Sequence, residues 1–209
     1  YQDILNNYDS MAAVIIRELD AIKKEYGSKR RTSVENAEEA VYEEKKMEET
    51  EVCFLMDRFG YMTLIDKNAY ERNKEAAHNE NRCVFLCMNT DKICIFTDKG
   101  KMHSIKAADI PLVRFRDKGT PADNLSNYDS SQERMLYVAP LGQIRQDQLL
   151  FVTRASMCKL VEGTEFDVAK RTIAATKLAQ DDELVFVGSA GEMEQVVFQS
   201  NGGYFLRFL

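Results

Sequence analysis

A turn-centred pattern recurs along most of the chain, and this repeat constrains the fold more than any single motif. The clearest copy is TDKGKMHSIK (97–106), and related copies are MDRFGYMTLID (56–66), TRASMCKLV (153–161) and QSNGGYFLRF (199–208). Aligning the copies places the turn residue at Gly60, Gly100, Ser156 and Gly202, at intervals of 40, 56 and 46 residues. Repeats of this period predict four-stranded blades stacked in series, as in propeller-like proteins.

The content of one repeat can be followed in residues 83–106. Two apolar runs, CVFLCM and ICIFT, flank the turn sequence NTDK, and DKG then provides the glycine that a tight hairpin needs before the alternating strand KMHSIK. The same order of runs recurs at 135–161 and again at 184–208. We therefore expect three hairpin-rich units, joined by longer crossovers at 107–131 and 162–182.

The N-terminal segment has a different period. Apolar or aromatic residues alternate at spacings of three and four, at Leu5, Tyr8, Ala12, Ile15, Leu19, Ile22 and Tyr26. This heptad seam predicts one long α-helix that ends near Gly27 and packs on a partner helix, from an upstream segment or from another copy of the chain. The seam and the lack of an initial Met predict a piece of a longer protein.

Charge separates this helix from the repeats. Residues 35–51 hold eight glutamates against Lys45 and Lys46, which indicates a solvated linker. We therefore predict three parts: an arm helix at 1–32, an acidic linker at 33–50 and β repeats at 51–209.

Several classes of protein are disfavoured by the composition. No apolar stretch approaches the roughly 18 residues of a membrane span, so we expect a cytoplasmic protein that makes no membrane contact. The five cysteines form no CxxC pair and four lie in apolar runs, which favours buried reduced thiols over disulfides. With two histidines in the chain, a zinc site is not expected. A nucleophile–base pair and a P-loop are both missing, so no catalytic residue is predicted.

Basic residues are concentrated in one stretch of the repeats. Residues 98–118 hold six bases against three acids, although the whole chain has a formal net charge of −6. A local basic patch of this kind is typical of a surface that binds a polyanion.

The order of these segments resembles that in a known family. The heptad helix, YGSKRRTSV (26–34), the acidic segment, FGYMTLID and FTDKGKMHSIKAADIP together resemble the A subunit of bacterial type IIA topoisomerases, DNA gyrase or topoisomerase IV. The resemblance covers essentially the whole chain. It implies that 1–32 is the end of the coiled-coil arm and that 51–209 holds the first three or so repeats of the C-terminal β-pinwheel, a disc whose basic rim bends duplex DNA. The expected fold is mainly β, a partial β-pinwheel of about three four-stranded blades preceded by one long α-helix.

The resemblance also implies what lies elsewhere. The family's catalytic tyrosine, metal-binding fold and ATPase partner lie outside this segment, so this chain should neither cleave DNA nor hold a cofactor. The parent would be an ATP-dependent topoisomerase that uses ATP and Mg²⁺ and works at the nucleoid, as a homodimer of A subunits that associates with a B subunit. In gyrase, a glycine- and glutamine-rich basic box wraps DNA, but the matching stretch here, 68–81, has no glycine. This departure favours a protein similar to topoisomerase IV or to a divergent gyrase.

The expected function is therefore non-catalytic: the chain binds and bends duplex DNA without sequence preference and guides it for strand passage. In the family's repeats, a lysine usually follows the turn glycine by three residues, and His103 and Lys159 occupy that position here. The predicted DNA-binding set is Lys99, Lys101, His103, Lys106, Arg114, Arg116, Lys118, Arg154, Lys159, Lys170 and Arg171. The alternative is a propeller-like scaffold that binds other proteins, which the acidic balance and a pI of about 5.2 favour.

Overall fold

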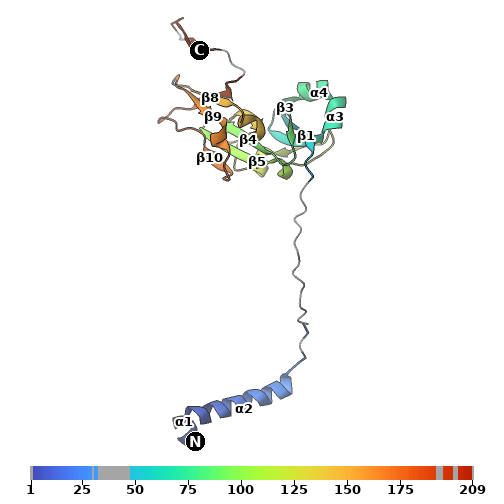
Figure 1. Ribbon diagram of the computed structural model, residues 1–209, viewed down its shortest axis with the longest axis vertical. Coiled ribbons are helices and arrows are strands. Elements are labelled where there is room, and N and C mark those ends of the chain that lie inside the picture. The colour runs from blue at the N-terminus through green and yellow to red at the C-terminus, as the bar shows by residue number, and fades with distance from the viewer. Residues whose placement is uncertain (1, 30, 33–47, 192–194, 200–201, 209) are drawn as a thin grey trace. The chain divides into compact units, whose positions relative to one another are not determined.

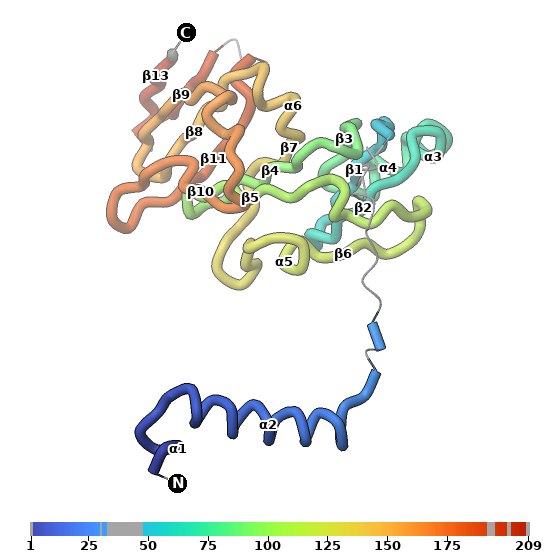
Figure 2. Tube along the Cα trace, turned by 60° about the horizontal axis from the view of Figure 1, so that its bottom comes forward, coloured from blue at the N-terminus to red at the C-terminus, as the bar shows by residue number. Residues whose placement is uncertain are grey.

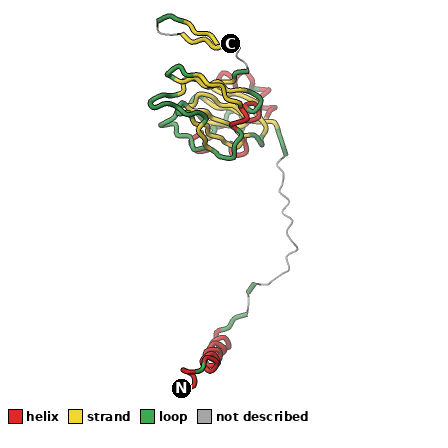
Figure 3. The backbone as a smooth tube through the Cα atoms, turned by 60° about the vertical axis from the view of Figure 1, so that its left-hand side comes forward, coloured by secondary structure: helices red, strands yellow, loops and turns green. Residues whose placement is uncertain are grey.

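The computed structural model describes residues 2–29, 31–32, 48–191, 195–199 and 202–208. The chain divides into two compact units, residues 1–45 and 46–209. Helices make up the described structure of the first unit, and strands with short helices make up the second (Figure 3). The predicted acidic linker at 33–50 lies mostly outside the described residues, and the three-part division remains a prediction.

The N-terminal unit contains two helices where one was expected, α1 (Gln2–Asn6) and α2 (Tyr8–Tyr26). Asn7 separates them, because its side chain accepts a hydrogen bond from the Asp9 N–H at 3.1 Å and so caps the start of α2. At the other end, the Gly27 N–H donates to the Lys23 carbonyl at 2.8 Å. Apolar side chains of the predicted seam, such as those of Ile15 and Leu19, are exposed within this unit.

The second unit is built from small antiparallel sheets (Figure 1). The first sheet has the order β3-β1-β2-β6, from β3 (Asn81–Met88), β1 (Glu51–Asp57), β2 (Tyr61–Asp66) and β6 (Thr120–Pro121). The second has the order β10-β5-β4-β7, from β10 (Thr172–Ala174), β5 (Lys101–Lys106), β4 (Lys92–Thr97) and β7 (Met135–Pro140). The third has the order β11-β8-β9, from β11 (Leu184–Ser189), β8 (Gln148–Thr153) and β9 (Cys158–Glu162). The described part of the fourth is the hairpin of β12 (Val196–Gln199) and β13 (Phe205–Phe208).

Each blade takes strands from successive segments of the chain. A hairpin such as β1–β2 provides two strands, the next segment adds a third on one side, and a short strand from the following crossover adds a fourth on the other. The mainly β, partial pinwheel fold is thus confirmed, with two four-stranded sheets followed by sheets of three and two described strands. One expectation was wrong: β3 pairs with β1 and not with β4, so residues 83–106 span two blades.

The core lies between neighbouring sheets, and β4 contributes to two core layers at once. Ile93 and Ile95 pack toward the first sheet, in the cluster that contains Phe54. Cys94 and Phe96 belong to the cluster with the third sheet, in which the Phe96 ring lies 5.1 Å from that of Phe166. Because side chains alternate along a strand, a strand between two sheets is apolar on both faces. This explains why the ICIFT run lacks alternation.

Two helices that the sequence analysis did not predict cover the remaining face of the first sheet. These are α3 (Lys67–Arg72) and α4 (Lys74–Glu80), and they pack Tyr70 and Ala77 against Cys53, Leu55 and Ile65 of that sheet. The stretch 68–81 therefore covers the first sheet on the face away from the second, as the neighbouring sheets cover both faces of the second. Shorter helices are α5 (Ala122–Leu125), α6 (Leu141–Ile144), η1 (Ala107–Asp109) and η2 (Gly163–Phe166).

The hairpin turns repeat in geometry as well as in sequence. Positive φ angles occur at Gly60 (86°), Gly100 (70°), Ser156 (62°) and Gly203 (81°). The expected fourth turn residue, Gly202, was one position early, because Gln199 pairs with Phe205 as Met56 pairs with Met62. Gly203 is therefore the equivalent of Gly60.

Candidate nucleic-acid interface

The contacts between blades define an inner and an outer side of the β unit. Strand β7, at the end of the second sheet, contacts both β3 and β11, the end strands of the first and third sheets, and we call this the inner side. The fourth strands, β6 and β10, occupy the opposite ends of their sheets (Figure 2). They therefore form the outer edges of the first and second blades.

The outer edge of the first blade carries three bases. The crossover runs along β2, where the Val113 N–H donates to the Leu64 carbonyl at 2.9 Å, and then enters β6. Between these points Arg114, Arg116 and Lys118 are exposed. The Lys118 ammonium lies 4.8 Å from the centre of the Tyr61 ring, which holds this side chain at the edge.

The outer edge of the second blade repeats this arrangement. Lys170 and Arg171 are exposed immediately before β10, and the Ser104 N–H donates to the Arg171 carbonyl at 2.8 Å. The Arg171 guanidinium lies 3.7 Å from the Asp109 carboxylate.

The strand registers show which edge residues are equivalent. Thr120 faces Met62 in the first blade, as Ile173 faces Met102 in the second, and each methionine lies two residues after its turn glycine. Two residues before Thr120 and Ile173 stand Lys118 and Arg171. A basic residue therefore occupies the same outer-edge position of two successive blades.

The other predicted residues lie elsewhere on the blades. Lys99 and Arg154 are exposed in the hairpin turns of the second and third blades, where Arg154 pairs with Glu183. Lys159 is exposed on β9, and Lys106 is exposed at the end of β5 that is opposite the turn.

His103 cannot contact a phosphate in this structure. Its side chain is 1% exposed, and its ring nitrogens lie 2.9 Å from the Glu133 carboxylate and 3.1 Å from the Thr172 hydroxyl. The Lys101 ammonium lies 2.5 Å from the same carboxylate. Burial disfavours the ionised form of Glu133, but hydrogen bonds from Lys101 and His103 outweigh it and lower its pKa. These residues form an internal network, and we leave His103 and Lys101 out of the interface.

Five bases remain together at the outer edges, and we call them the outer-edge cluster. They are Arg114, Arg116, Lys118, Lys170 and Arg171. Within the described ranges, Arg171 is the only one of the five that forms an ion pair. The cluster thus presents unneutralised positive charge.

Three further arginines, Arg58, Arg82 and Arg134, were not among the DNA-binding residues predicted from the sequence. They line one pocket of the β unit although they are distant in sequence. A count of local charge density cannot find such a group. Alignment of the repeats gives a partial signal, since Arg58 and Arg154 occupy equivalent turn positions.

Other kinds of site have little support in the part of the chain that the structure describes. No group of three or more His, Cys, Asp or Glu side chains there could hold a metal ion. None of the described helices is long and apolar enough to cross a membrane. The cysteines are free thiols, and burial raises the pKa of Cys53, Cys87 and Cys94 to about 12.

Comparisons with known proteins agree with this architecture. Residues 91–130 and 147–190 match the model of the DNA gyrase C-terminal domain, β-propeller. The DNA gyrase A subunit of Clostridium acetobutylicum is 27% identical over 220 residues, which cover 99% of this chain and 26% of the relative. The same protein of Neisseria gonorrhoeae is 26% identical over 220 residues, covering 100% of this chain and 24% of the relative.

Two solved structures share the fold. The C-terminal domain of DNA topoisomerase IV aligns with a TM-score of 0.64 at 22% identity, covering 76% of this chain and 51% of that one. The E. coli ParC C-terminal domain aligns with a TM-score of 0.58 at 10% identity, and the alignment covers 76% of this chain and 64% of that domain. The predicted resemblance to the A subunit of a bacterial type IIA topoisomerase is confirmed. The chain spans about a quarter of the length of the curated relatives that it matches.

Proposed function

We propose that the β unit binds duplex DNA through its outer-edge cluster, without sequence preference, as a non-catalytic part of a type IIA topoisomerase A subunit. The observation that carries this proposal is the basic residue at the same outer-edge position of two successive blades, Lys118 and Arg171. Backbone contacts from such residues neutralise phosphates and carry no sequence information. The matched relatives are gyrase A subunits, which supports this choice of polyanion.

The edge geometry also favours bending of the DNA. The charges lie in the crossovers directly before β6 and β10, the end strands of separate sheets, so a straight duplex that contacts one blade gains further contacts by curving toward the next. Such contacts offset the deformation energy, which is of order 1–6 kcal/mol for a smooth bend of 40–90° over a site of 20–30 base pairs. The outer edges would thus guide a segment of DNA toward strand passage.

The remainder of the parent protein is part of the same proposal. Cleavage chemistry, ATP and Mg²⁺ would come from other domains and from a B subunit, and two A subunits would pair. A protein of this function works in the cytoplasm, at the nucleoid. Because α3 and α4 pack on the first blade and contain no glycine, we expect this fragment to leave little positive writhe on relaxed plasmid.

Fluorescence anisotropy with labelled duplexes of unrelated sequence tests the proposal. With about four phosphates engaged, log K against log salt should slope at about −3.6, and the duplexes should bind equally well. A flat salt response, or no binding at low salt, would favour the alternative of a scaffold that binds proteins.

A further inference from the structure

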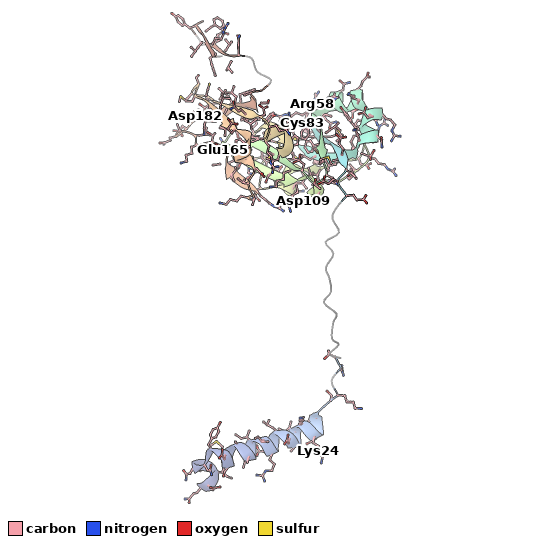
Figure 4. All side chains as sticks on the ribbon, in the orientation of Figure 1. Lys24, Arg58, Cys83, Asp109, Glu165 and Asp182 are labelled. Atoms are coloured by element: carbon pink, nitrogen blue, oxygen red, sulfur yellow. The ribbon has the colours of Figure 1, made fainter. Side chains whose placement is uncertain are left out.

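Three arginines from separate segments line a pocket of about 240 Å³ in the β unit. Arg58 lies in the β1–β2 turn, Arg82 lies on β3, and Arg134 directly precedes β7; all three are exposed. None belongs to the outer-edge cluster. Figure 4 shows Arg58 and Asp109, the partner of Arg171, on opposite sides of the β unit.

Backbone hydrogen bonds fix the positions of two of these arginines. Asp98 bonds Arg134 twice, since its carboxylate accepts the Arg134 N–H at 2.8 Å and its own N–H donates to the Arg134 carbonyl at 3.0 Å. Arg58 lies in a turn closed by Asp57, whose carboxylate accepts the N–H groups of Phe59 at 2.8 Å and Tyr61 at 2.9 Å. Both side chains therefore start from defined points at the pocket.

A β-bulge places the third arginine. Met56 pairs with Cys83 and Asp57 pairs with Asn81, so Arg82 is the extra residue on β3. One nitrogen of its guanidinium donates to the Met135 carbonyl at 2.9 Å, which ties β3 to the start of β7. This guanidinium forms no ion pair with a described residue, and its other donors can face a ligand.

The acids that share the pocket have other partners. Asp57 bonds its own turn, Asp123 accepts the Ser130 N–H at 2.8 Å, and Glu133 lies between Lys101 and His103. Over the described ranges, none of the three arginines forms an ion pair. The three guanidinium groups therefore keep donors free, while the carboxylates of Asp57, Asp123 and Glu133 are held by backbone N–H groups or by other side chains.

We propose that this pocket binds a phosphodiester of duplex DNA, as a second contact point away from the outer edges. The guanidinium fork matches phosphate oxygens, and three such groups around one pocket select an oxyanion. The inference rests on the proposed function, because DNA supplies the phosphate. A duplex that leaves the outer edge and crosses to the turn side of the first blade would engage both sites.

A unique fluorophore can report on this pocket directly. The chain has no tryptophan, and Phe59 lines the pocket with 87% of its surface exposed, so Phe59→Trp adds a single reporter. We expect a short duplex to change the tryptophan emission. In the same background, Arg58→Gln with Arg134→Gln should abolish the change, weaken duplex binding about tenfold and make the salt slope shallower by about 0.9 for one lost phosphate contact.

Matched variants separate this effect from a loss of charge or of folding. Arg17→Gln with Lys24→Gln removes the same charge from α2, in the other unit. This variant should keep the emission change and the duplex affinity of the Phe59→Trp protein. Arg82→Lys keeps the charge but loses the fork, and should give an intermediate affinity. Circular dichroism spectra that match that of the Phe59→Trp protein would confirm that each variant is folded.

Each failure has a distinct signature. If the labelled duplex binds while the tryptophan emission stays constant, the pocket inference is wrong and the proposed function stands. If the wild-type chain does not bind duplex in the anisotropy assay, the proposed function itself is wrong. If inorganic phosphate changes the emission but duplex does not, the pocket binds small anions and its assignment to DNA is overturned.

Discussion

Replacement of Gly100 by alanine should destabilise the β unit more than the same change at the equivalent turn of the first blade. Gly100 has a φ of +70°, and an added Cβ would lie 2.9 Å from the Thr176 carbonyl oxygen and 3.2 Å from the Leu178 side chain. The Gly100 carbonyl also accepts the Ala175 N–H at 2.8 Å. A new methyl group here pushes on the crossover that completes the second blade.

The magnitude follows from two separate terms. The left-handed conformation disfavours alanine by about 1 kcal/mol. Displacement of a packed backbone segment adds about 2 kcal/mol, within the range for overpacking. The total of about 3 kcal/mol corresponds to a fall in Tm of roughly 6–12 °C for a domain of this size.

The repeat provides the controls. At Gly60, φ is +86° and the nearest atom to an added Cβ is a Met135 methyl carbon at 4.0 Å. Gly60→Ala should therefore lower the free energy of unfolding by only about 1 kcal/mol. Ser156 already has a positive φ of 62°, and Ser156→Gly should not destabilise the protein measurably. Urea unfolding followed by near-ultraviolet circular dichroism measures all three. Equal losses at Gly60 and Gly100 would refute the steric contribution of the crossover.

Two further predictions concern buried groups. Because the pKa of Glu133 is lowered in the folded state, its ionised form stabilises the fold above the unfolded pKa of about 4.3, and this stability is lost as pH falls through the folded pKa. Glu133→Gln should therefore reduce stability at pH 7 by about 3 kcal/mol and flatten the acid limb of a urea-midpoint profile; a profile parallel to the wild type would contradict this. Iodoacetamide should alkylate the exposed Cys158 of the native protein while Cys94, fully buried and with a pKa of about 12, stays unmodified until unfolding. Peptide mass spectrometry would disprove this if both thiols reacted at one rate.

Local sequence predicted the hairpins well because their determinants are local. The strand expected at KMHSIK has the bounds of β5, because turn residues and apolar runs fix both ends. The pairing of β3 was not predicted, because it depends on contacts with β1, and the strand β2 lies between the two in the sequence. The helices α3 and α4 likewise bury an apolar face of the first sheet. Their position could not be predicted from residues 67–80 alone, because it depends on that sheet.

The candidate site was predictable only in part. Charge density found the stretch at 98–118, but the equivalence of Lys118 and Arg171 required the strand registers. His103 lies on a strand in which polar and apolar residues alternate, and this pattern predicted that the His103 side chain is exposed. The segment after α5 covers that face, and it places Glu133 against the imidazole and the Tyr128 ring 6.1 Å from it.

The most direct test of the central claim is the salt dependence of duplex affinity for Lys118→Gln combined with Arg171→Gln. Each residue is proposed to engage one phosphate at the same position of successive blades. The slope of log K against log salt should therefore become shallower by about 1.8, equally for duplexes of different sequence. The double variant Arg17→Gln with Lys24→Gln, which removes the same charge from α2, should keep the wild-type slope. Identical slopes for the wild type and the edge variant would show that DNA does not lie along the outer edges.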